Sequence, residues 1–177
     1  MNKFTKILAA LALSAVSGIA SAVPITGSIG FNGAYNLTGG STLATATGID
    51  ITSAHTSGVV TGSFAGIADG TVASYSDFTF NPAGPVPAIW SVAGFTFDLN
   101  QMSVDFQSAS LLALSGSGTI SSTDENLDDS NGKWTFTANA TGQNLTWSSS
   151  AAPEPAMALL LATGLIGFGF ARKMRKA

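Results

Sequence analysis

The chain has 177 residues, of which 45% are hydrophobic and 10% charged, with no Cys, one His and a formal net charge of −3. The absence of Cys excludes disulfides and thiol chemistry, and a single His excludes metal sites built from His and Cys. Between residues 23 and 152 there are nine acidic residues and one base, Lys133, a formal charge of −8 that disfavours binding to nucleic acid and to anionic lipid.

Residues 1–22 predict a cleaved secretory signal peptide. Two lysines precede an apolar run over residues 7–16, which is too short to anchor the chain in a membrane. Small residues follow the run, and Ala20 and Ala22 flank Ser21 in an A-x-A cleavage site. We therefore expect signal peptidase and the secretion machinery to export the chain.

Residues 23–150 predict a single secreted all-β domain. Val, Ile, Phe, Trp and Thr alternate in short stretches that are separated by Gly, Ser, Asn and Pro, without a sustained helical period. About eight short antiparallel strands in one domain are typical of a β-sandwich or a barrel-like fold. We expect strands over residues 25–35, 44–51, 58–64, 71–80, 88–99, 110–121, 133–140 and 144–149.

The stretch from residue 88 to residue 99 carries five large apolar residues whose parity changes midway. One strand keeps all five on the same face only if it contains an extra residue, so we predict a β-bulge at Ala93 and Gly94. Phe78 and Phe80, on the strand before, also share one face. The five predicted core residues of residues 88–99 are Trp90, Val92, Phe95, Phe97 and Leu99.

Two later stretches alternate regularly. Trp134 and Phe136 are expected to face the core, as are Leu145 and Trp147 on the following strand, while Ser, Thr and Asn face outward. Hydroxyl-rich sheet faces that carry an occasional aromatic ring are suited to binding sugars. Core packing is nevertheless the favoured interpretation for each Trp, because Trp is highly buried on average.

An acidic loop over residues 124–132 is the densest cluster of oxygen ligands between the two ends of the chain. Its carboxylates make it a candidate calcium site, but the spacing fails the EF-hand pattern. The favoured alternative is a solvated hairpin loop. The candidate ligands are Asp124, Glu125, Asp128 and Asp129.

The sequence offers little support for catalysis. His55 is the only imidazole and lies in a Ser/Thr-rich segment that we interpret as an exposed loop. No Ser lies in a G-x-S-x-G turn, and the glycines form neither a phosphate-binding nor a dinucleotide-binding motif. We predict a protein without enzymatic activity and without a cofactor.

Residues 151–177 divide into three parts. The triplet Pro153, Glu154 and Pro155 favours extended backbone and ends where a helix is able to begin. Residues 156–171 are uncharged and apolar and predict a short transmembrane helix. The basic residues of the tail, residues 172–177, hold that helix end in the cytoplasm by the positive-inside rule; they are Arg172, Lys173, Arg175 and Lys176.

These three parts, in this order, resemble the PEP-CTERM sorting signal of Gram-negative bacteria over about 25 residues. The resemblance implies an inner-membrane precursor that an exosortase, a membrane protease, processes for delivery to the cell surface or the extracellular space. It also implies an association with exopolysaccharide, so we expect a structural or adhesive component of a biofilm. The alternative is a secreted carbohydrate-binding or carbohydrate-processing domain that uses the same signal.

Overall fold

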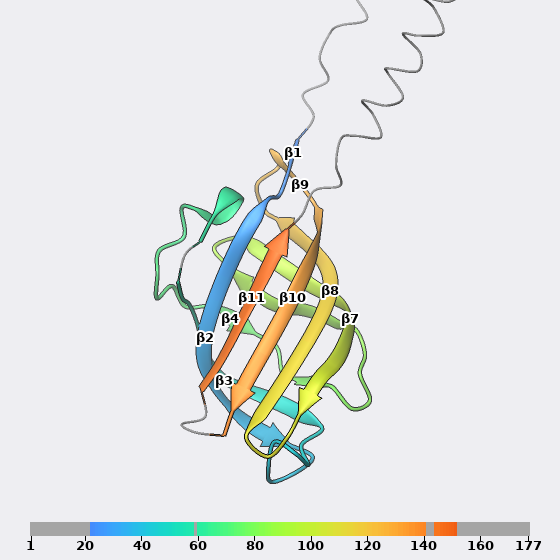
Figure 1. The fold of residues 1–177 in the computed structure, drawn as a ribbon. Coiled ribbons are helices and arrows are strands. Elements are labelled where there is room, and N and C mark those ends of the chain that lie inside the picture. The colour runs from blue at the N-terminus through green and yellow to red at the C-terminus, as the bar shows by residue number, and fades with distance from the viewer. Residues whose placement is uncertain (1–21, 59, 141–143, 152–177) are drawn as a thin grey trace, which may run out of the picture.

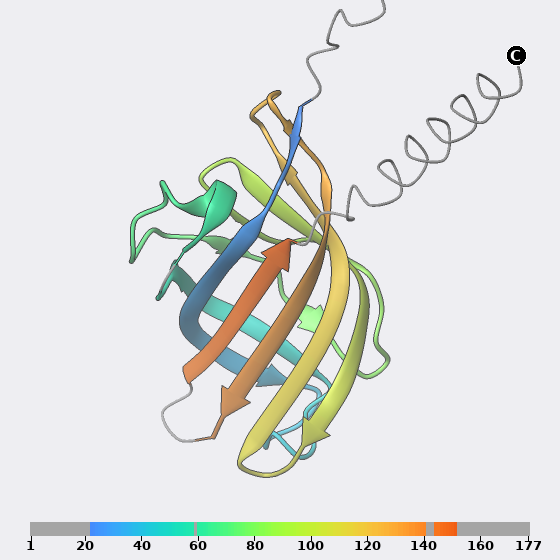
Figure 2. The same ribbon diagram turned by 45° about the horizontal axis from the view of Figure 1, so that its top comes forward.

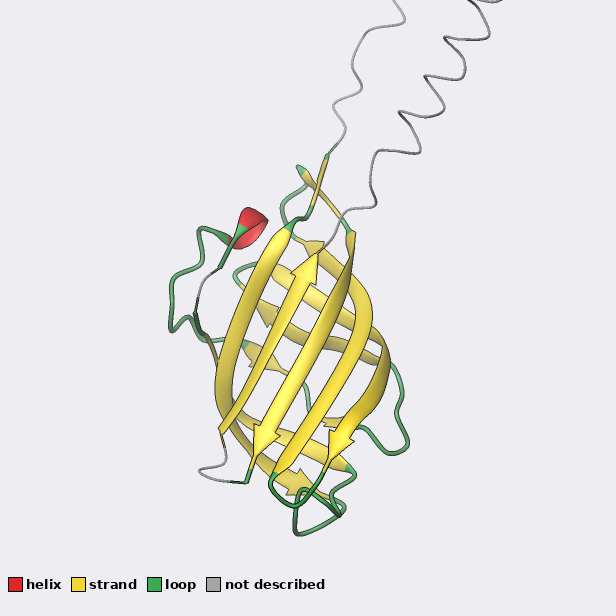
Figure 3. Ribbon diagram, in the orientation of Figure 1, coloured by secondary structure: helices red, strands yellow, loops and turns green. Residues whose placement is uncertain are grey.

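The computed structural model describes residues 22–58, 60–140 and 144–151, the last of these by their backbone alone. The described residues form eleven strands and one 3₁₀ turn, and the remainder is loop (Figure 3). In chain order the elements are β1 (Val23–Pro24), β2 (Gly27–Thr38), β3 (Gly48–Thr56), η1 (Gly62–Phe64), β4 (Ser74–Tyr75), β5 (Phe78–Thr79), β6 (Val86–Val92), β7 (Phe95–Gln107), β8 (Leu111–Ser122), β9 (Leu127–Asp128), β10 (Ser130–Asn139) and β11 (Asn144–Ala151).

Nine of the strands form one sheet, which confirms the all-β prediction. Its order is β4-β6-β7-β8-β10-β11-β2-β3-β5, and its neighbours are antiparallel. Strands β2, β11, β10, β8 and β7 lie side by side, and the sheet curls so that β3 and β4 lie behind them (Figure 1). The order ends at β4 and β5, so this single curled sheet is not a closed barrel. The strands β1 and β9 form a separate parallel pair.

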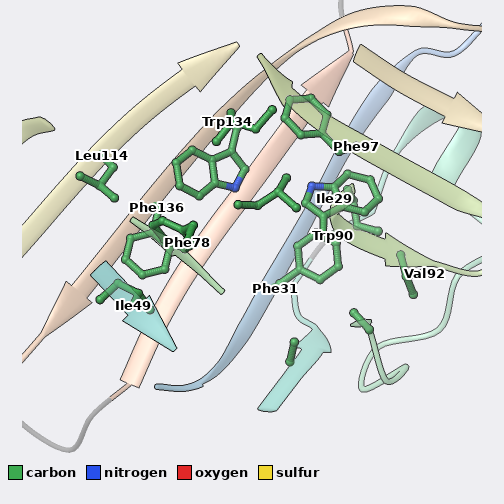
Figure 4. Packing of buried hydrophobic residues seen from close by; sticks show 14 of the residues in the cluster. Ile29, Phe31, Ile49, Phe78, Trp90, Val92, Phe97, Leu114, Trp134 and Phe136 are labelled. Carbon is green, nitrogen blue, oxygen red and sulfur yellow. The ribbon is translucent and has the colours of Figure 1, made fainter. Parts of the chain in front are cut away.

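The core fills the inside of the curl. Every second residue of β10 is buried, and Trp134 and Phe136 are fully enclosed, as predicted. Phe78 of β5 meets these two rings edge-on, with ring centroids 5.7 and 5.4 Å apart (Figure 4). Because β5 is the last strand of the sheet and β10 lies near its middle, this contact joins the end of the curl to its centre.

The predicted bulge at Ala93 and Gly94 is wrong, although its five core residues are all buried. These two residues have φ of 49° and 85° and form the two-residue turn of a hairpin between β6 and β7. Positive φ at both central positions matches the right-handed twist of the flanking strands. Val92 then pairs with Phe95, and Trp90 with Phe97, on the same face. The parity changes because the chain reverses, and no extra residue is needed.

Some of the other predicted strands are confirmed, and others are wrong. Residues 25–35, 110–121, 133–140 and 144–149 correspond closely to β2, β8, β10 and β11, but the described residues of the range 58–64 form no strand. Their backbone instead lies against the start of β2, where Thr61 donates to the carbonyl of Ser28 (2.9 Å) and Ser63 to that of Thr26 (2.8 Å). Residues 44–51 are half loop, and residues 71–80 contain only the two short strands β4 and β5. Some apolar residues outside the strands, such as Phe64 of η1, are buried, so their sequence pattern resembles that of a strand.

The two ends of the described body lie at the same pole. Gly27, which opens β2, pairs with Ala151, which closes β11. Strand β1 leaves from this pole as well (Figure 2). Segments that precede β1 and follow β11 therefore join the domain at one end of it.

Candidate functional site: a groove across β7, β8 and β10

A groove of about 430 Å³ crosses the outer face of the sheet over three neighbouring strands. The strand register arranges its lining as three rows, each with one residue from β7, one from β8 and one from β10. The middle row forms the floor through its backbone, because the side chain of Trp134 points into the core and Gly116 has none. The rows are Gln101, Ser117 and Lys133; Met102, Gly116 and Trp134; and Ser103, Ser115 and Thr135.

Two register shifts in β7 shape the side of the groove that this strand forms. The register of β7 with β8 shifts between Leu99 and Gln101, and again between Val104 and Phe106. After the second shift Phe106 pairs with Ala113, which lies on the outer side of β8. Regular alternation would place Phe106 on the core side, whereas the bulge turns its ring outward and leaves it 52% exposed.

Asp105 forms hydrogen bonds with both serines of the third row, Ser103 and Ser115. Its Oδ1 accepts hydrogen bonds from the hydroxyls of Ser115 (2.9 Å) and Ser103 (3.3 Å), and the two hydroxyls are 3.2 Å apart. All three side chains lie on the outer face. They form a fixed polar cluster beside the Phe106 ring, because the bulge brings residues 105 and 106 to the same side of the sheet.

Lys133 is exposed at the opposite corner of the groove and is the only basic residue of the described part of the chain. The next residue, Trp134, anchors the floor from below, because its indole Nε1 donates to the Tyr75 hydroxyl (2.5 Å). Burial raises the pKa of the Tyr75 hydroxyl well above 10, and the hydrogen bond from Trp134 only partly opposes this rise. The tyrosine therefore stays neutral and keeps its acceptor role over a wide pH range.

The groove is lined by hydroxyl, amide and amine groups, and the Asp105 carboxylate and the exposed Phe106 ring lie next to it on the same outer face. Such a set donates and accepts hydrogen bonds over a surface and offers an apolar face beside it. Sequence reasoning missed this site, because it assigned no strand to residues 100–107. The available signal is the regular alternation of polar and apolar residues over Gln101–Gln107, which predicts a strand but gives no sign of the bulge that turns Phe106 outward.

The proposed calcium ligands are not brought together. Asp124 accepts hydrogen bonds from the backbone N–H (3.0 Å) and the side-chain amide (2.8 Å) of Asn126, and these bonds lower the pKa of its carboxyl. Leu127 and Asp128 form β9, so the loop is partly strand. In residues 22–58 and 60–140, no group of three or more His, Cys, Asp and Glu is placed to hold a metal ion.

Two further predicted residues, Ala22 and His55, lie among the described ones. The amide of Val23, which follows the expected signal cleavage site at Ala22, donates to the carbonyl of Asn126 (2.9 Å) in the acidic loop. His55 lies in β3, half buried, and forms a bridge with Val72. The expectation of an exposed loop histidine is therefore wrong.

The remaining predicted residues lie outside the described ones. They are Ala20, the sorting triplet Pro153, Glu154 and Pro155, the apolar run 156–171, the basic residues Arg172, Lys173, Arg175 and Lys176, and the side chains of Leu145 and Trp147. Among the residues that are described, no helix combines the length and the hydropathy of a membrane span.

Comparison of the chain with models of known families, with curated proteins and with solved structures finds no match.

Proposed function

We propose that this chain is an exported, non-enzymatic protein of the cell surface or extracellular matrix, sorted through its C-terminal segment by an exosortase-type membrane protease. Its role is structural or adhesive, in association with exopolysaccharide. In this proposal residues 1–22 form a signal helix and residues 156–171 a transmembrane helix, and the precursor lies in the inner membrane until it is cut.

The observation that carries the proposal is the placement of both ends of the body at one pole. Ala151 pairs with Gly27 there, and these residues lie two before Pro153 and five after Ala22, respectively. A precursor tethered by residues 156–171 would thus present the opposite pole away from the membrane. Removal of residues 1–22, or of the chain from Pro153 onward, leaves the paired strands of the body complete.

The test replaces Glu154 in the sorting triplet. Glu154→Ala is expected to leave export unchanged and to block the cut, so that mass spectrometry of the exported material finds the C-terminal peptide still attached. Glu125→Ala removes an exposed carboxylate from the body and serves as the matched control. Normal processing of the Glu154→Ala chain would contradict the proposal.

A carbohydrate-binding domain is the second candidate, and the groove across β7, β8 and β10 favours it. Phe106 and the hydroxyl and carboxylate cluster lie next to the groove, on the same outer face of the sheet. Incubation of the exported protein with oligosaccharides separates the classes. Binding without turnover indicates a binding module, and release of shorter sugars indicates a carbohydrate-processing enzyme.

A further inference from the structure

We infer that the groove across β7, β8 and β10 binds a mostly neutral saccharide chain through a unit that bears a carboxylate, with Lys133 as the partner of that carboxylate. The inference deepens the second candidate function and rests on it. Three independent features carry it: the polar rows, the apolar strip beside them and the position of the only base.

The two polar rows suit a ligand with many hydroxyl groups. Gln101 and Lys133 end one row, and Ser103 and Thr135 end the other, with a serine between them in each. Hydroxyls both donate and accept, so they match sugar hydroxyls in either orientation. Strands lie ~4.8 Å apart, which makes each row about 10 Å wide from β7 to β10. A ligand that engages a whole row must be longer than one pyranose ring.

An apolar strip continues the groove toward the β7–β8 turn. Phe106 is 52% and Leu111 38% exposed, and Ala113 lies between them on the outer side of β8. Pyranose rings have an apolar face of C–H groups that packs on aromatic rings, while their edges make hydrogen bonds. The bulge that turns Phe106 outward places this ring directly beside Asp105, so one sugar unit is able to meet both.

The position of Lys133 selects the charge of the ligand. It is the only base in a body of formal charge −8, and it lies in this groove. A densely charged polyanion has many charges near the acidic residues of the body, so the body repels it. At physiological salt, charges more than about 8 Å apart are largely screened from one another. A single carboxylate on a neutral chain therefore feels mainly the nearby ammonium group of Lys133. Asp105, at the far corner, remains an acceptor for neutral hydroxyls.

The test measures binding of oligosaccharides to the full-length chain in detergent micelles by titration calorimetry. The probes are tetrasaccharides of neutral hexoses with and without one uronic acid. We expect the uronate-containing probe to bind more tightly. Lys133→Gln should weaken that probe about fivefold, the size of one exposed ion pair, and should leave the neutral probe unchanged. Lys133→Arg should restore the preference.

Phe106→Ala is expected to weaken both probes about tenfold, because the apolar contact is shared. Val72→Ala, which shortens an even more exposed apolar side chain outside the groove, should change neither. The inference is overturned if neither probe binds, if Lys133→Gln affects both probes equally, or if Phe106→Ala binds as well as the original chain. Export and C-terminal cleavage are measured separately with Glu154→Ala, so failure of the glycan test does not imply failure of the sorting proposal.

Discussion

The two halves of β7 do different work although they belong to one strand. Phe95–Leu99 pairs with β6 on one side and β8 on the other, and its three apolar residues are at most 8% exposed. Gln101–Gln107 pairs with β8, contains a bulge and presents most of its side chains to solvent. The first half builds the core and the second builds the groove. Burial therefore ends within the strand, at the register shift after Leu99.

Two glycines of β8 mark this change. A Cβ on Gly118 would lie 1.9 Å from the carbonyl oxygen of Asp98, and one on Gly116 would lie 2.5 Å from that of Gln101. The backbone of β7 thus approaches β8 closely on both sides of the first register shift. The close contact between the two backbones requires glycine at both positions of β8. It determines where β7 changes from core residues to groove residues.

The largest effect on stability is expected from a charge placed in the first half of β7, and the same exchange in the second half is the comparison. Phe97→Asp buries a carboxylate at a fully enclosed site, where the ring now stacks on Trp90 at 5.9 Å, and should cost more than about 4 kcal/mol of the free energy of unfolding. Phe106→Asp makes the same exchange at an exposed site and should change stability by no more than about 0.5 kcal/mol. Urea denaturation of the full-length chain measures both.

The contrast between these variants decides whether the two halves differ. Typical domains have 5–15 kcal/mol of stability, so the Phe97→Asp chain should be largely unfolded under native conditions. Equal destabilisation by the two variants would show that the second half is as much a part of the core as the first.

A smaller effect is expected at the boundary itself. Gly118→Ala forces β7 away from β8 or strains both strands, and should cost about 1–3 kcal/mol, as overpacking usually does. Gly84→Ala is the control, because nothing lies within 4 Å of the Cβ position there. Thermal unfolding compares the two. If Gly118→Ala unfolds at the same temperature as Gly84→Ala, the close approach of the strands does not determine the boundary.

The sequence predicts the regular strands that form the core, but not the irregular part of β7 that follows Leu99. Regular alternation on β10 predicts its inward residues Trp134 and Phe136 correctly, because burial on one face imposes a period of two. The parity change at Ala93 does not distinguish a bulge from a two-residue turn, because both shift the alternation of buried residues. The bulges that shape the groove were missed, because they depend on which residues β8 places opposite, and that pairing is not encoded locally. The groove is likewise assembled from three strands and has no contiguous motif.

Tyr75 supports the groove from the core side and gives a pH-dependent prediction. Its pKa is raised by burial, so the folded chain holds the phenol proton more tightly than the unfolded chain does. This stability is fully present below about pH 10, the ordinary pKa of Tyr, and is lost as the pH rises from there toward the folded-state pKa.

Tyr75→Phe should remove this alkaline loss and cost about 1 kcal/mol at neutral pH, since the indole of Trp134 loses its acceptor. Tyr35→Phe is the comparison, because burial raises the pKa of Tyr35 as well, but less strongly. Urea midpoints between pH 8 and about 11 measure both. An alkaline loss that persists in Tyr75→Phe and vanishes in Tyr35→Phe would assign it to the other tyrosine.

The smallest change in stability is expected at Asp105, in the exposed half of β7. Asp105→Asn keeps the size of the side chain and an oxygen that accepts from Ser115, and exposed hydrogen bonds of this kind add little, so the free energy of unfolding should change by about 0.5 kcal/mol or less. If the second half of β7 serves binding, the same variant should nevertheless weaken the neutral saccharide probe, because a charged acceptor forms stronger hydrogen bonds than an amide does. Measuring denaturation and binding on one protein preparation separates the two effects. A loss of stability without a loss of binding would assign Asp105 to the fold and remove it from the groove's function.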